Sequence, residues 1–272
     1  MAPSIAIIAH ENDDFIKRSS FLREIARLWQ DDGLDVGLYI KPSPQAKADV
    51  AILHVNLSVV PSEYLDFAQN FPVTLNGRVK DISKRAISFN ILQRHANYEG
   101  AVMVKANENY GGEPEQRLEK SIGITSKYRR LTTWEYYVLD SLDRVTEEVW
   151  SNPHLVVEKF LPEKEGEFFI LRHWYFLGDT EFHRKIYSIN PLVKGEGVIR
   201  REPITEPIPE ELRERRRQLG FDFGKFDYAL VDGKLVVYDV NKTPGLGAVL
   251  APEHARLQLP ILKTGIYQYF TK

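Results

Sequence analysis

The sequence predicts a mixed fold in which a small N-terminal α/β unit precedes two α+β regions. Over residues 1–75, short apolar runs alternate with segments of helical periodicity, and this alternation favours a mostly parallel sheet. Near the C-terminal end, two alternating apolar segments flank Asp232-Gly233, a pattern typical of a β-hairpin. These two observations define the fold class.

The composition is that of an ordinary globular protein, with 43% hydrophobic and 27% charged residues. A formal net charge of -2 argues against nucleic acid or an anionic membrane surface as a partner, and it sets no oligomeric state. The N-terminal apolar run, 5–9, stops at His10 and is followed by acids, unlike a signal peptide. The absence of cysteine excludes thiol chemistry, and we expect a cytoplasmic protein.

In the N-terminal unit, the run 4–9 reads as a buried strand. Asn12, Asp13 and Asp14 are candidate N-caps for a helix that repeats apolar residues as far as Trp29 and stops at Gly33. The expected later elements are strands at 36–40, 50–55 and 73–75 and a helix at 61–71.

The middle of the chain continues with helices and short strands. Thr132 and Glu135 have the spacing of a capping box, which predicts a helix over 133–145. The other predicted elements are helices at 81–95 and 210–219, strands at 102–105, 155–157 and 168–176, and a polar loop at 106–112.

The C-terminal hairpin places charged side chains on one face, because alternate residues of a strand point the same way. The apolar rows are Phe226, Tyr228 and Leu230 on the first strand, and Val236, Tyr238 and Val240 on the second. The opposite face carries Lys225 and Asp227 on the first strand, and Asp239 and Asn241 on the second.

The register decides whether the two acids meet. A two-residue turn would place Asp227 opposite Tyr238, mixing charge into the apolar face. We therefore predict a three-residue loop, Val231–Gly233, which pairs Leu230 with Lys234 and sets Asp227 diagonal to Asp239. Two carboxylates and the amide oxygen of Asn241 are the hard ligands that Mg²⁺ prefers, so the hairpin predicts a magnesium site.

The segment Asp239–Gly245 resembles the metal-binding signature of the ATP-grasp superfamily, an acid, one residue, Asn, then a Pro-Gly turn. The resemblance implies that Asp227, Asp239 and Asn241 bind Mg²⁺ beside the phosphates of ATP. Two positions depart from the family pattern. Asp239 stands where the family has Glu, and Lys225 stands where it often has Arg, which loses the bidentate fork.

The same resemblance implies the rest of a nucleotide site. Lys105 and Lys84 correspond to the two lysines that reach the phosphates, and Asn109, Gly111 and Gly112 lie in the loop that covers them.

The segment 157–161 is similar to the hinge of D-alanine–D-alanine ligases, so Glu158, Lys159, Phe160 and Leu161 are expected at the adenine edge. Glu167 matches the acid that accepts the ribose hydroxyls, with Glu165 as an open alternative.

The implied architecture is a small Rossmann-like domain (1–77) before an ATP-grasp fold whose two lobes (78–160 and 161–272) grip ATP. The implied reaction is ATP-dependent activation of a carboxylate, from a small molecule or a peptide, as an acyl phosphate that an amine or thiol then attacks. Arg172, Arg184 and Lys225 are the cations expected near the reacting groups, although a salt bridge is the alternative for each arginine. A phosphotransferase and an inactive nucleotide-binding module are the alternative functions.

Overall fold

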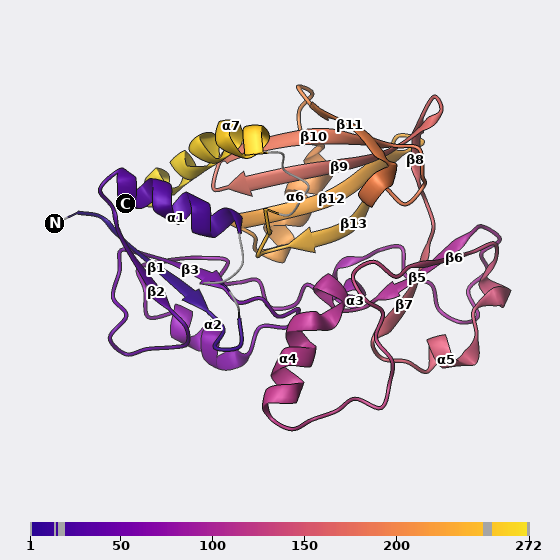
Figure 1. Ribbon diagram of the computed structural model, residues 1–272, viewed down its shortest axis with the longest axis horizontal. Coiled ribbons are helices and arrows are strands. Elements are labelled where there is room, and N and C mark those ends of the chain that lie inside the picture. Colours follow the sequence, from indigo (N-terminus) through magenta and orange to yellow (C-terminus); the bar gives the residue numbers. More distant parts are fainter. Residues whose placement is uncertain (1, 14, 16–19, 247–251, 271–272) are drawn as a thin grey trace.

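The computed structural model describes residues 2–13, 15, 20–246 and 252–270. Its described strands form three sheets that follow one another along the chain (Figure 1). The first is parallel with four strands, the second antiparallel with three, and the third antiparallel with six. No helix among these residues combines the length and apolar composition that crossing a bilayer needs.

The N-terminal sheet has the order β2-β1-β3-β4, and its strands are parallel as predicted. Its elements are β1 (Ser4–Ala9), α1 (Phe21–Asp31), β2 (Asp35–Tyr39), β3 (Val50–His54), α2 (Ser62–Ala68) and β4 (Val73–Leu75). Odd and even positions of β1 enter different apolar clusters: Ile7 packs with Trp29 of α1, and Ile8 packs with Tyr64 of α2. The two helices therefore cover opposite faces (Figure 1).

The start of α1 differs from the prediction. The helix begins at Phe21, and the Ser20 side chain accepts a hydrogen bond from the Arg23 N–H at 3.2 Å. Ser20 is itself extended and is bridged to Gly245. The N-cap of α1 is therefore Ser20 rather than Asn12 or Asp13, and Asp14 lies outside the described residues.

The second sheet has the order β6-β5-β7. The elements of this region are α3 (Lys84–Ile87), β5 (Val102–Ala106), a 3₁₀ turn (Asn109–Gly112), α4 (Glu113–Ser121), β6 (Tyr137–Leu139), a second 3₁₀ turn (Leu142–Arg144), α5 (Glu147–Trp150) and β7 (Leu155–Lys159).

Two predicted helices in this region are wrong. The helix expected over 81–95 shrinks to α3, because Ser88 is already extended. Over 133–145, Glu135 does accept the Thr132 N–H at 2.8 Å, but the chain then becomes β6 and pairs with β5. Aromatic and β-branched residues in β6 favour a strand once an open edge is nearby. The helix α4 was missed.

The third sheet is ordered β11-β10-β9-β12-β13, with β8 also paired to β9. Its elements are β8 (Glu163–Glu165), β9 (Phe168–Leu177), β10 (Thr180–Ser188), a 3₁₀ turn (Gly195–Gly197), β11 (Val198–Pro203), α6 (Glu210–Leu219), β12 (Phe223–Val231) and β13 (Lys234–Asn241), followed by α7 (Pro252–Leu262) and a 3₁₀ segment (Lys263–Tyr269). The predicted helix at 210–219 and the hairpin are confirmed.

The two faces of this sheet have different partners. One face packs Trp174 and Phe226 against Leu212 of α6 in a buried cluster. The other face packs Tyr175 against Phe21 of α1, with the two rings stacked at 4.8 Å, and α7 lies beside α1 (Figure 1). The N-terminal unit thus covers only part of that face, beside the charged residues described next.

Candidate active site

Four polar side chains form one row across the third sheet. Asp227 pairs with Asp239 on one side and with His173 on the other, and His173 pairs with Arg184. Residues directly opposite one another in antiparallel strands share a face. The row Arg184–His173–Asp227–Asp239 therefore lies on the face away from α6.

The hairpin reaches this arrangement by an unpredicted route. The turn is two residues long, with positive φ at Asp232 (51°) and Gly233 (75°), and Leu230 pairs with Leu235. The three-residue loop is therefore wrong. A register shift after Asp227 places one extra residue, Tyr238, on β13. This bulge lets Asp227 face Asp239 directly rather than diagonally.

The bulge also corrects the predicted apolar row of β13. Val240 and Val237 pack with Tyr228 in the cluster under α6, whereas Tyr238 leaves that row. Its hydroxyl donates to the main-chain oxygen of Leu161.

Two lysines neutralise the two acids. Lys84, at the start of α3, is buried and places its Nζ 2.7 Å from Asp239 Oδ1. Lys225 is 2.9 Å from Asp227 on its own strand. Burial lowers the pKa of Lys225, but the charge of Asp227 outweighs burial, so the pKa lies above its ordinary value. The Lys225 ammonium group is therefore a charged partner of Asp227.

A third lysine joins the second and third sheets. Lys105 of β5 lies 2.7 Å from the carboxylate of Glu158 on β7, and both side chains are at most 5% exposed. The same ammonium group donates to the main-chain oxygen of Tyr238 at 3.0 Å. Lys105 thus sits at the junction of the sheets, next to the hairpin that carries the acids.

The donor set fits magnesium. Asp227 Oδ1 and Asp239 Oδ1 are buried, and each lies beside a lysine ammonium group, Lys225 at 2.9 Å and Lys84 at 2.7 Å. Asn241 Oδ1 accepts the Thr243 N–H at 2.8 Å and lies 3.3 Å from the Thr243 hydroxyl. The described residues contain no group of three or more His, Cys, Asp or Glu side chains suited to a metal. A cation here would have two carboxylates and one amide, which suits Mg²⁺ because it also takes water and phosphate ligands.

The expected phosphate loop is packed rather than open. Asn109 is buried, and its N–H donates to Ser58 Oγ at 2.8 Å. Gly111 and Gly112 are buried with positive φ, and a Cβ on Gly111 would lie 2.8 Å from the Thr133 nitrogen. The loop is therefore held against the 131–133 segment in the described conformation.

The hinge residues are largely engaged within the protein. The Lys159 and Phe160 N–H groups donate to Asn90 and Ala101 oxygens, and the Glu158 side chain pairs with Lys105. Leu161 lies between β7 and β8, and its carbonyl accepts the Tyr238 hydroxyl.

The two candidate ribose acids occupy the β8–β9 hairpin. Glu167 is exposed in the turn. Glu165 is 2.8 Å from Lys185 and bonds the Tyr187 hydroxyl, so the alternative acid is already paired.

The two candidate arginines lie on opposite faces. Arg172 pairs with Lys185 and Tyr228, points to the α6 face, and binds the Glu163 carboxylate at 2.6 Å. It forms a salt bridge, the alternative given for this arginine, because strand alternation carries it away from the acids. Arg184 shares the face of Asp227 and is 2% exposed.

Residues that the sequence did not single out also approach the acids. His173 stands between Arg184 and Asp227, with its Nε2 3.4 Å from Asp227 Oδ1. Burial lowers its pKa well below the ordinary value, as do the charges of Lys225, Arg184 and Arg201, so the ring is neutral. No spacing in the sequence could reveal His173, because cross-strand register places it.

The segment after β10 contributes a contact to the second sheet region. Lys194 donates to the Tyr136 hydroxyl at 2.7 Å, and its ammonium group lies over the Trp134 and Tyr136 rings. Desolvation there lowers the pKa of Lys194 to about 8, against the charges of Asp239 and Asp227, which raise it.

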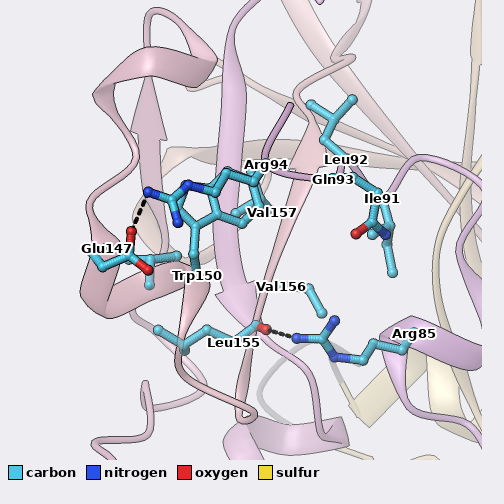
Figure 2. Close-up of a pocket in the computed structure, with 11 residues that line it drawn as sticks. Arg85, Ile91, Leu92, Gln93, Arg94, Glu147, Trp150, Leu155, Val156 and Val157 are labelled. Carbon is cyan, nitrogen blue, oxygen red and sulfur yellow. Dashed lines mark hydrogen bonds and ion pairs between the residues drawn. The ribbon is translucent and has the colours of Figure 1, made fainter. Parts of the chain in front are cut away.

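A separate cavity of about 240 Å³ lies beside β7 (Figure 2). Its lining includes Arg85, Arg94 and Trp150, and Arg94 pairs with Glu147 at its rim. This cavity is not lined by the two acids of the row or by the lysines beside the hairpin, Lys84, Lys105 and Lys225.

No family model matches the chain, and no curated protein matches it. Solved structures do. The chain is similar to a RiPP-associated ATP-grasp ligase from Chryseobacterium gregarium, in complex with ADP and a leader and core peptide, at 11% identity over 98% of this chain and 97% of that chain (TM-score 0.52). It is similar to macrocyclase MdnC from Microcystis aeruginosa MRC, bound with precursor peptide MdnA, at 10% identity over 97% and 99% (TM-score 0.52). A third is the ATP-grasp ligase PsnB complexed with minimal precursor, at 12% identity over 98% and 99% (TM-score 0.50). At such identities the likeness shows the fold.

Proposed function

We propose that this chain, which has the ATP-grasp fold, is an ATP- and magnesium-dependent ligase that joins a carboxylate to an amine or thiol through an acyl phosphate. The products would be the ligated acid, ADP and phosphate. The observation that carries the proposal is the convergence of three lysines from different elements on the acidic hairpin. Lys84 meets Asp239, Lys225 meets Asp227, and Lys105 meets the hairpin main chain.

This convergence is what phosphoryl transfer requires. The protein need not supply a nucleophile, because the reaction depends on neutralising phosphate charge and holding the reactants in line. Asp227, Asp239 and Asn241 would hold Mg²⁺, which would neutralise phosphate charge when bound. Lys84, Lys105 and Lys225 would add fixed positive charge around the transferred group.

The other nucleotide contacts are proposed from the fold. Regions 78–160 and 161–272 would act as the two lobes, with 1–77 as a Rossmann-like preceding domain. The Leu161 N–H would meet the adenine edge between the lobes. Glu167 would accept the ribose hydroxyls. Asn109, Gly111 and Gly112 would turn toward the phosphates only if their loop leaves the 131–133 segment.

The acid substrate would lie on the face of the Asp227–Asp239 row. Arg184 is the buried cation beyond His173 on this face, and we propose that it binds the acid. A peptide carboxylate is a candidate substrate alongside small acids, because structures of similar fold contain precursor peptides.

Trapping the acyl phosphate tests the proposal without knowledge of the acceptor. The protein, MgATP and a library of free and peptide carboxylates are incubated with hydroxylamine, and hydroxamate and ADP are measured. We expect hydroxamate with a subset of acids, in equal amount to ADP. A stable phosphorylated product without hydroxamate would overturn the ligase in favour of the phosphotransferase.

One hairpin substitution and its control test the metal site. Asp239→Asn should reduce magnesium-dependent turnover at least about 10–100-fold, because even residues behind metal ligands have effects of that size. Asp232→Asn removes the same charge from the exposed turn and tolerates its positive φ, so it should leave turnover unchanged. Wild-type activity in a folded Asp239→Asn protein would refute the metal assignment.

A further inference from the structure

Arg184 is buried without an acidic partner among the described residues. It is 2% exposed, and its Nε and Nη1 atoms have no hydrogen-bond acceptor. Among the described residues, its Nη2 contacts the Tyr175 hydroxyl at 3.2 Å and His173 Nδ1 at 3.4 Å, and no carboxylate. A buried charge without a counter-charge is costly, so this guanidinium is arranged for an anion that the chain itself does not provide.

A second arginine doubles the unbalanced charge. Arg201 of β11 pairs with Ile186, two residues beyond Arg184 on β10, so the two arginines are diagonal neighbours on one face. The Nε of Arg201 is also buried and has no acceptor in the part of the chain that the structure describes. Burial lowers the pKa of Arg201, as does the charge of Arg184. Two like charges side by side destabilise a sheet unless an anion joins them.

The nearby acids do not meet this need. On the same face, Asp227 is paired with Lys225 and Asp239 with Lys84. Glu202 follows Arg201 on β11 and so points to the other face, where it pairs with Arg200 at 3.1 Å. Within the described residues, both site acids are therefore already neutralised.

We propose that Arg184 and Arg201 bind a second carboxylate of the acid substrate, which is therefore a dicarboxylate, either a free diacid or neighbouring acidic side chains of a peptide. This inference rests on the proposed ligase function. The reacting carboxylate has to lie beside the phosphates at Asp227 and Asp239. Arg184 stands two strands away from Asp227, about 10 Å between main chains, so it holds a different group of the same molecule.

Bidentate binding explains the residue type. A guanidinium presents paired N–H donors that match a carboxylate, and the donors of Arg184 that lack acceptors include Nε and Nη1. An amide of the same size offers one acceptor and no charge. The site should therefore discriminate a diacid from its monoamide by about tenfold or more, the range for a charged hydrogen bond lost in a buried site.

The test compares matched acids. Succinate, glutarate and adipate are each set against their monoamides, and N-acetyl-Glu-Glu-amide is set against N-acetyl-Glu-Gln-amide, in which the blocked C-terminus leaves a single carboxylate. The kcat/KM for hydroxamate formation and calorimetric binding in the presence of MgADP are measured for each pair. We expect at least one diacid to exceed its monoamide by about tenfold in both measurements. Preference in the peptide pair alone identifies a peptide substrate, and preference among the free acids identifies a small diacid.

Arg201→Gln and Arg200→Gln form the variant pair. Arg200 is the neighbouring residue on β11, but it stacks on Tyr187 at 3.9 Å and pairs with Glu202 on the other face. Arg201→Gln should abolish the preference for the diacid, and Arg200→Gln should retain it. Equal affinity for the diacid and the monoamide in every pair, or a preference that survives Arg201→Gln, would overturn the inference.

The two proposals fail separately. If diacid binding is lost in Arg201→Gln but no acid yields hydroxamate, the ligase function is refuted and the dicarboxylate site is supported. If monoacids and diacids yield hydroxamate equally well, the ligase function is supported and the dicarboxylate site is refuted.

Discussion

Lys105→Met should destabilise the protein strongly, because it leaves the buried Glu158 carboxylate without its counter-charge where the second and third sheets meet. The Glu158 carboxylate is 2% exposed, its Oε1 has no hydrogen-bond donor, and its Oε2 lies 2.7 Å from Lys105. Methionine keeps the length and the apolar stem but supplies no charge. Removing one partner of a buried ion pair costs about 3–5 kcal/mol, mostly from the charge left behind.

The cost has an upper bound that depends on pH. A buried carboxylate without a counter-charge can be neutralised by binding a proton, which limits the cost, and the pKa of an ordinary glutamic acid is about 4.3. At pH 7 that protonation costs about 3.7 kcal/mol, from about 1.36 kcal/mol per pH unit. At pH 5 it costs about 1 kcal/mol. The stranded group has a raised proton affinity in the folded variant, so its penalty is present at pH 7 and declines as the pH falls toward about 4.3.

Urea unfolding at pH 7 and pH 5 measures the effect. We expect Lys105→Met to lose about 3–4 kcal/mol at pH 7 and clearly less at pH 5. Adding Glu158→Gln removes the stranded charge, so the double variant should regain most of the loss. It should retain a deficit of about 1 kcal/mol because the Tyr238 carbonyl loses its donor. A single variant that loses under 1 kcal/mol, or a double variant no more stable than the single, would refute the reasoning.

Two further predictions concern other parts of the fold. The buried Lys242 ammonium group donates to the Leu57 carbonyl, and burial lowers the pKa of this lysine to about 7. Because the folded-state pKa of this lysine is lowered, the folded protein binds fewer protons than the unfolded chain between about pH 7 and 10. The free energy of unfolding of wild type should therefore rise with pH relative to that of Lys242→Met, by up to about 1.4 kcal/mol per pH unit, as measured by urea unfolding. A difference between the two proteins that does not change with pH would contradict this. Gly111→Ala should lower the melting temperature more than Gly123→Ala, since both have positive φ but only at Gly111 would a Cβ meet backbone, 2.8 Å from the Thr133 nitrogen. Equal shifts would show that strain, not contact, sets the cost.

The sequence predicted those elements whose signals are local. The strands of the N-terminal unit, the helix at 210–219 and the hairpin around Asp232-Gly233 are all present. The failures share a cause. The expected helix at 133–145 and most of that at 81–95 lost to pairing with strands distant in sequence, as β6 pairs with β5 and Ile91 bridges to Glu158. Helical periodicity is a local signal and carries no information about a pairing strand more than 30 residues away, so tertiary context overrides it.

The candidate site was predictable where it depends on one hairpin. Asp227 and Asp239 share a face because the chain connecting them is short and its alternation is visible in the sequence. The combination of turn and bulge that aligns the two acids was not predictable, since a bulge at Tyr238 compensates for a turn one residue shorter than expected. Local alternation fixes that two acids can meet; burial of the apolar rows then selects among turn and bulge combinations that the sequence leaves equivalent.

The arginines show where such reasoning needs the third dimension. Arg172 and Arg184 belong to adjacent strands, and the turn at Gly178 pairs Leu177 with Thr180, which puts the two arginines on opposite faces. Which of these faces holds the acids depends on β12, whose Asp227 pairs with His173 from more than 50 residues away. A slip of β12 by one residue would turn Asp227 toward the face of Arg172 and break the hydrogen bond that the Leu230 N–H donates to the Glu163 carboxylate at 2.7 Å. This bond from β12 to Glu163, whose carboxylate Arg172 also holds, therefore helps to specify the register that places Asp227 and Arg184 on one face.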